Sequence, residues 1–367
     1  MQPPMEAWTG RTERLVTGAG YGRRQGDAPA LTMDARDVRT SYLDFVGRPP
    51  FERELRRWSG MNRHALATAL LGCEEFWQHW ISEQLFYLML IDNFRPSGDA
   101  IEELPAGLAT HLLTPREALH RLVLSSSFDL RNPGADTFVT VVMEQLVGRV
   151  VQSSKGELAG GKAAYDGREA RFLGKPASNQ ADVIRIAIED RAATAHLLER
   201  EYWRILHRAP DPRELRGWIR EVHREPSRLL EVMRLWYLSE PYDRRLEQPV
   251  AKPNRLFVRS LFVDLMGRVP TQDELEPLRS ALDGLADSRP LRSVVVRALI
   301  GSELVTLNTK KSISNPEAWV SGRFERLLGR TPQPSELEVF VEAFADESCG
   351  LDTILYALVS GTEYQSY

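Results

Sequence analysis

Side chains that could bind an anion recur in this chain at a fixed spacing. At four places an arginine lies six residues after an aromatic residue and two residues before a proline. These pairs are Arg48 and Pro50, Arg208 and Pro210, Arg268 and Pro270, and Arg330 and Pro332. A guanidinium can hold a carboxylate or a phosphate by paired hydrogen bonds. The interpretation that we favour is structural: each arginine bonds helix-end carbonyls and packs on its aromatic residue.

Histidine and cysteine, the usual metal ligands, are scattered. The histidines are His64, His79, His111, His120, His196, His207 and His223. None falls in HExxH or in a close pair of histidines, and Cys73 and Cys349 belong to no CxxC motif. The sequence therefore predicts no metal site, no disulfide framework and no cofactor. His79 lies among aromatic residues, where a core role is favoured over a ligand role.

No catalytic motif is found either. Gly160-Gly161-Lys162 lacks the spacing of a phosphate-binding loop and follows no expected strand, so residues 153–181 are interpreted as a linker or insertion. The chain contains neither a GxSxG elbow nor a GxGxxG motif after a strand. No catalytic residue is predicted, although an enzyme could assemble its site from distant residues.

The repeated arginine belongs to a stretch that predicts a helix, a sharp stop and a second helix. Glycine stands at the expected left-handed stop in three copies, and His207, at some cost in strain, in the other. The proline blocks continuation of the first helix. Thr271 or Asp211 can then cap the next helix, with Glu274 or Glu214 three residues on completing a capping box.

In each copy, an expected apolar helix follows and is succeeded by a short motif that contains glutamate. One repeat unit is therefore about three helices in roughly 55 residues. The expected fold is all-α, with repeated helix–stop–helix units in two lobes joined near residues 153–181. The predicted parts are a flexible arm (1–32), an N-terminal helical domain (33–152), the linker or insertion (153–181), a second helical unit (182–250) and a C-terminal pair of units (251–367).

Composition narrows the function classes. With 367 residues, 43% of them hydrophobic, the chain is long enough for two or three cored domains. Its net charge of −4 argues against a nucleic-acid partner. No apolar run is long enough to cross a membrane, and the N-terminus lacks the apolar core of a secretory signal. The sequence as written predicts a cytoplasmic protein, or an exported one if a leader has been removed.

Aromatic residues mark candidate interfaces. Trp8 and Tyr21 lie in the basic segment 1–32, which is either a disordered leader or an arm that orders on a partner. Trp77, Trp80 and Phe86 lie on an expected helix that is apolar around much of its circumference. Such a helix is central in a domain or buried at an interface.

Several stretches resemble a known family. Residues 42–50 (YLDFVGRPP), 76–80 (FWQHW) and 145–152 (QLVGRVVQ) resemble the planctomycete cytochrome-associated domains of unknown function. Residues 328–337 and 360–364 are similar to the companion C-terminal domain of that family. The resemblance implies a CxxCH haem motif after residue 152, where this chain has SSKGE, so haem binding is not carried over. The repeated stretch also resembles phycobilisome-linker-type helical modules, which organise assemblies.

Together these observations predict a non-catalytic structural or interaction protein, a subunit of a larger assembly. Its partners would be other protein subunits, identical or different. The alternative is an exported redox-associated protein that accompanies a cytochrome or binds a cofactor non-covalently, with His79 or His120 as contacts. A composite-site enzyme is the least favoured hypothesis.

Overall fold

The computed structural model describes residues 32–90 and 101–367. Helices make up 70% of it, and its only sheet within the described residues joins β1 (Ala170–Phe172) to β2 (Lys175–Ala177). These strands are antiparallel, with Ala170 opposite Ala177. The predicted all-α class is therefore confirmed.

Contacts divide the chain into two compact units, and they do so differently from the predicted domains. The described part of unit 1 lies within residues 71–242, whereas unit 2 combines residues 30–70 with residues 243–367. The first copy of the repeated stretch, near Arg48, therefore belongs with the third and fourth copies. The expected N-terminal domain 33–152 is split at the end of its third helix, α4 (Arg63–Leu71).

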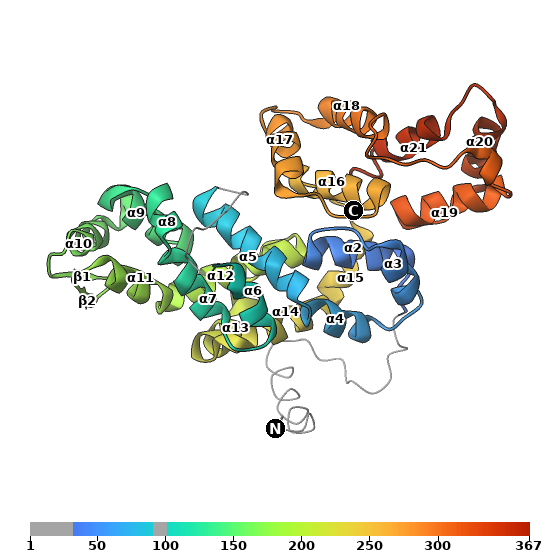
Figure 1. The fold of residues 1–367 in the computed structure, drawn as a ribbon. Coiled ribbons are helices and arrows are strands. Elements are labelled where there is room, and N and C mark those ends of the chain that lie inside the picture. The colour runs from blue at the N-terminus through green and yellow to red at the C-terminus, as the bar shows by residue number, and fades with distance from the viewer. Residues whose placement is uncertain (1–31, 91–100) are drawn as a thin grey trace, which may run out of the picture. The chain divides into compact units, whose positions relative to one another are not determined.

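Unit 1 is a set of short helices with one hairpin (Figure 1). In order it contains α5 (Glu74–Met89), η2 (Ile101–Glu103), α6 (Leu104–Ala109), α7 (Pro115–Val123), α8 (Ser126–Arg131), α9 (Gly134–Val141), the π-helix η3 (Val142–Val147), η4 (Val151–Ser153), α10 (Lys155–Tyr165), β1, β2, α11 (Gln180–Ile188), α12 (Arg191–Leu206), α13 (Pro212–Arg224), η5 (Pro226–Arg228) and α14 (Leu229–Tyr237). The helix α15 (Glu240–Glu247) starts in unit 1 and ends in unit 2.

Residues 153–181, interpreted as a linker or insertion, are an ordered and packed part of unit 1. They form α10 and the β1–β2 hairpin, which lies beside α10 and α11 (Figure 1). A Cβ at Gly160 would lie 2.0 Å from the carbonyl oxygen of Arg171, and one at Gly161 would lie 2.9 Å from the ring of Phe172. The Gly-Gly pair is thus explained by the close approach of α10 to the hairpin, and not by a phosphate loop.

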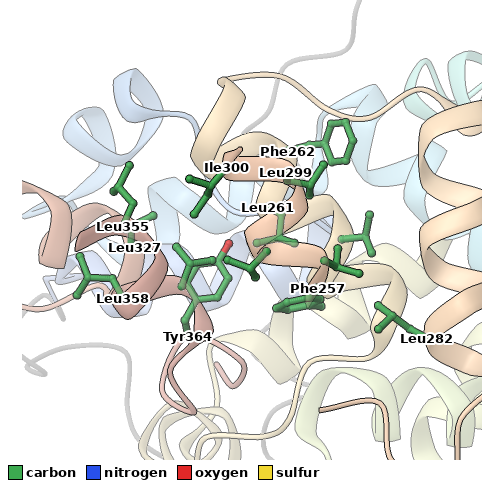
Figure 2. Packing of buried hydrophobic residues seen from close by; sticks show 14 of the residues in the cluster. Phe257, Leu261, Phe262, Leu282, Leu299, Ile300, Leu327, Leu355, Leu358 and Tyr364 are labelled. Atoms are coloured by element: carbon green, nitrogen blue, oxygen red, sulfur yellow. The ribbon is translucent and has the colours of Figure 1, made fainter. Parts of the chain in front are cut away.

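Unit 2 contains α2 (Ala35–Val46), α3 (Glu52–Trp58), α4, the end of α15, α16 (Asn254–Leu261), the π-helix η6 (Phe262–Met266), α17 (Gln272–Asp283), α18 (Arg289–Ile300), η7 (Lys310–Ser312), α19 (Pro316–Leu328), α20 (Pro334–Ala345) and α21 (Leu351–Ser360). Figure 2 shows part of its core, where Phe257, Leu261, Leu299 and Leu358 pack around Tyr364. Burial of these side chains is the main favourable contribution to its stability.

The two chain segments of unit 2 are joined by buried ion pairs. Arg39 of α2 contacts Asp264 at 2.5 Å, and Asp44, also of α2, pairs with Arg245 at 3.2 Å. The hydroxyl of Tyr364 donates to Asp264 at 2.8 Å. Burial alone would lower the pKa of Arg39, but the neighbouring Asp264 carboxylate outweighs burial and raises it. Removing one partner would leave a buried charge uncompensated.

The C-terminal residues close this buried cluster. The backbones of Val250 and Tyr367 exchange two hydrogen bonds, of 2.8 and 2.9 Å. The Lys252 ammonium donates to the carbonyl of Tyr364 and lies 4.1 Å from the centre of its ring. Burial, followed by the positive charge of Arg39, lowers the pKa of Lys252 well below its ordinary value.

Across residues 32–90 and 101–367, each helix is too short or too polar to traverse a lipid bilayer.

Substituting Gly160 by alanine should destabilise unit 1 by about 1–3 kcal/mol, because the added methyl group forces α10 away from the hairpin. Gly156 lies in the same helix with open space around it, so Gly156→Ala should be neutral or stabilising by up to about 1 kcal/mol. Urea unfolding followed by tryptophan fluorescence measures both variants. Equal free energies of unfolding for the two variants would show that stability does not depend on the close approach of α10 to the hairpin.

Candidate functional site

The four predicted corners share one backbone geometry. In each, the helix ends at a residue in the left-handed region: Gly47 (φ 70°), His207 (φ 48°), Gly267 (φ 70°) and Gly329 (φ 71°). The following segment, which carries Pro50, Pro210, Pro270 or Pro332, is not helical, and a new helix starts directly after it. The predicted helix–stop–helix geometry is therefore present at each of the four places, including the strained position of His207.

The arginine of each corner binds the glutamate six residues later. The shortest contacts are 2.8 Å for Arg48–Glu54, 3.2 Å for Arg208–Glu214, 2.6 Å for Arg268–Glu274 and 2.7 Å for Arg330–Glu336. Each arginine also donates to the carbonyl of the next residue, at 3.0 to 3.5 Å. The carbonyl that is bound lies in the non-helical segment and not at the helix end, where it was predicted. The glutamate partner was not predicted.

The same glutamate caps the second helix. Its carboxylate accepts the N–H of the residue before that helix: Phe51 at 2.7 Å, Asp211 at 3.3 Å, Thr271 at 2.8 Å and Gln333 at 2.8 Å. The capping boxes predicted at Asp211 and Thr271 are confirmed. One carboxylate therefore joins the stop of the first helix to the start of the second.

The aromatic residue completes the corner. The guanidinium carbon lies 5.0 to 5.4 Å from the ring centre of Tyr42, Tyr202, Phe262 or Phe324 in the four copies. Packing of the arginine on its aromatic residue, as predicted, is therefore confirmed. Each arginine is held on three sides by its own corner, so the geometry supports the structural interpretation over an anion site.

The candidate interface residues fall into different environments. Trp8 and Tyr21 lie outside the described residues. Trp77 and Trp80 are only 3% and 1% exposed, so they are core residues of unit 1 and do not form a surface for another subunit. The indole N–H of Trp80 donates to Glu201 at 3.0 Å. Phe86 is half-buried. The apolar circumference of α5 is explained by its central position in unit 1.

A cavity of about 40 Å³ lies within unit 1, among α5, α7, η3 and the helices α11 to α14. We call it the Arg200 cavity. Its polar lining consists of Arg200, Arg116, Thr194, Gln84 and Gln145. Apolar side chains, among them leucines of α5, α7 and η3, make up the rest of the wall. The cavity is assembled from eight elements, η5 included, so no local motif could have revealed it.

Arg200 packs on the ring of Tyr87, and Tyr87 is in turn hydrogen-bonded to His196. Its guanidinium carbon lies 3.3 Å from the centre of the Tyr87 ring. The Tyr87 hydroxyl and His196 Nε2 are 2.9 Å apart, and a Cβ at Gly148 would lie 2.7 Å from the His196 ring. Burial, and then the charge of Arg200, lower the pKa of His196, which favours a neutral ring beside the Tyr87 hydroxyl.

Arg116 and Thr194 are both hydrogen-bonded to a second histidine, His223. Arg116 donates to the backbone carbonyl of His223 at 2.7 Å, and the Thr194 hydroxyl lies 3.2 Å from His223 Nδ1. Burial, and then the charge of Arg116, lower the pKa of His223. Two of the seven scattered histidines therefore position cavity residues, whereas His79 and His120 do not line the cavity.

Two buried amides have oxygens without a partner. The Gln84 side chain is 1% exposed, and its Nε2 donates to Glu201 at 3.1 Å. Neither Gln84 Oε1 nor Gln145 Oε1 accepts a hydrogen bond from the described part of the chain. Buried acceptors of this kind are normally satisfied, so each calls for an explanation.

No cluster of histidine, cysteine, aspartate and glutamate suited to a metal ion occurs among the described residues.

The corner glutamates should make the stability of unit 2 sensitive to acid. Hydrogen bonds from Arg268 and Arg330 lower the pKa values of Glu274 and Glu336 from 4.5 to about 2. Because the folded pKa lies below the unfolded value, the stabilisation is complete above about pH 4.5 and is lost as the pH falls towards 2. We expect a loss of about 1 kcal/mol or less for each corner, since both pairs are partly exposed.

Urea unfolding at pH 6, 4 and about 2.5 measures this loss. The matched variant Glu274→Gln/Glu336→Gln keeps an acceptor for the cap but cannot titrate, so its stability should fall less on acidification. An identical pH dependence in both proteins would assign the acid sensitivity to other carboxylates.

No protein-family model, no curated protein and no solved structure matches the chain. The resemblance to the cytochrome-associated domains consequently stays a prediction.

Proposed function

We propose that this chain is a non-catalytic structural or interaction protein that acts as a subunit of a larger assembly. The observation that carries the proposal is that the charged groups of the repeated motif are paired with one another. Arg48, Arg208, Arg268 and Arg330 each bind a glutamate of their own corner. The most frequent charged motif in the chain therefore stabilises helix corners and leaves no repeated reactive group.

Exposed apolar side chains supply candidate contacts for partners. In unit 1, Leu112 and Leu130 are 81% and 80% exposed. In unit 2, Val294 and Val339 are 60% and 61% exposed. Single exposed apolar residues are common on monomers, so these positions define the test and do not by themselves identify an interface. The redox-associated alternative gains no support, because His79 and His120 do not line the cavity.

The proposal predicts that the full chain, tagged and purified from its source cells, has a mass above the 41.7 kDa of the monomer. The variant pairs Leu112→Ser/Leu130→Ser and Val294→Ser/Val339→Ser remove the apolar contacts of one unit each. We expect at least one pair to weaken association by about tenfold, because one or two apolar anchors are worth more than 1.4 kcal/mol. Sedimentation velocity measures the mass.

Two exposed glutamates provide matched controls. Glu199→Ser in unit 1 and Glu338→Ser, beside Val339 on α20, change the surface without removing apolar area. Association should be unchanged in both. A protein that sediments as a 41.7 kDa monomer and retains no stoichiometric partner would contradict the proposed function.

A further inference from the structure

The Arg200 cavity has an unbalanced charge. Arg200 and Arg116 both line it, and no aspartate or glutamate does. Among the described residues, Arg200 forms no ion pair, and its guanidinium lies over the face of Tyr87. The carboxylates of Glu201 and Glu83 act on its charge from outside the cavity lining. A guanidinium always carries its charge in a protein, and its fork of N–H groups matches a carboxylate or another oxoanion. The cavity therefore favours an anionic group at this end.

The arginines call for a hydrogen-bond acceptor, whereas the glutamine side chains of the cavity call for a hydrogen-bond donor. Gln84 and Gln145 line the same cavity, and the Oε1 atom of each is buried and accepts no hydrogen bond from the described residues. The Gln84 amide orientation is fixed, because its Nε2 faces the Glu201 carboxylate at 3.1 Å. An unsatisfied buried acceptor costs about 1–3 kcal/mol. A ligand that donates a hydrogen bond to these oxygens would remove that cost.

Size and wall chemistry limit the ligand further. The volume of about 40 Å³ exceeds what one water needs, yet it admits only a few non-hydrogen atoms. Leu88, Leu119, Leu146 and Ile188 contribute apolar wall. An inorganic phosphate would present oxygens to these leucines and to the amide oxygens alike. A short organic acid carries its charge at one end only.

We propose that the Arg200 cavity binds a small organic carboxylate that carries a hydroxyl or amino donor. The carboxylate contacts the guanidinium of Arg200, with Arg116 adding positive charge. The donor group contacts Gln84 Oε1 or Gln145 Oε1, and the short carbon chain lies against the leucines. Thr194, whose hydroxyl is held by His223, is a further polar contact. This site is independent of the proposed assembly role.

Titration calorimetry of the full chain with lactate, glycine, propionate and inorganic phosphate tests the proposal. Lactate and propionate differ by one hydroxyl group. The difference between their affinities therefore measures the hydrogen bond donated to the amide oxygens. We expect lactate or glycine to bind with a Kd of about 1 mM or tighter, and propionate about tenfold more weakly. Phosphate should bind more weakly than the donor-bearing acids.

Variants separate the cavity from other cationic sites. Arg200→Gln should weaken lactate binding at least about tenfold, because the charged hydrogen bonds are lost. Gln84→Leu should reduce the preference for lactate over propionate. Arg297→Gln is the matched control, since Arg297 also lies over a tyrosine ring, that of Tyr356, but in unit 2. Its lactate affinity should equal that of the wild type.

Three results would overturn the inference. They are no heat from any carboxylate at about 10 mM, equal affinity for phosphate and lactate, or lactate binding that survives Arg200→Gln. Circular dichroism of each variant confirms that it is folded before titration. If Arg200→Gln fails to fold, Tyr87→Phe gives the second measurement. It frees the ring from His196 and should weaken lactate binding through a misplaced Arg200, whereas unchanged affinity would contradict the proposed geometry.

Discussion

A helix that stops and restarts leaves backbone donors and acceptors without partners. At each corner one glutamate accepts the N–H of the residue before the second helix, and the arginine bound to it donates to a carbonyl of the corner. Glu274, for example, accepts the N–H of Thr271 and the guanidinium of Arg268 at the same time. The two ends are thereby tied together across a left-handed residue and a proline. The arrangement occurs in both units, so the directions in which successive helices leave a corner depend on this carboxylate.

Electrostatics plays two different roles in the molecule. In unit 2, buried charges are paired, as in Arg39 with Asp264, and such pairs specify which chain segments meet more than they add net stability. In unit 1, the half-buried Arg200 lies over Tyr87, and among the described residues it forms no ion pair. The first arrangement is complete in the protein alone. In the second, the guanidinium of Arg200 can still bind an anionic ligand. For this reason we propose a binding site at the cavity and not at the repeated motif.

Local sequence patterns predicted local structure well. The aromatic, arginine and proline spacing predicted the four stops, and the Thr271 and Asp211 capping boxes followed from side-chain chemistry over three residues. Long-range organisation could not be read in this way. The pairing of Arg39 with Asp264 spans 225 positions, and the cavity draws residues from eight elements. Gly160 was misread because a glycine that admits a neighbouring carbonyl and one that loosens a linker are identical in sequence.

Unit 2 is built from two stretches of chain, and the described part of unit 1 lies between them in the sequence. During translation, α2 leaves the ribosome long before Asp264 exists. At about 5–20 residues per second, the 225 positions between Arg39 and Asp264 correspond to a delay on the order of 10–45 s. Unit 1 has its full complement of residues within that interval. The nascent α2, α3 and α4 meanwhile carry apolar side chains whose partners in unit 2 have not yet been synthesised.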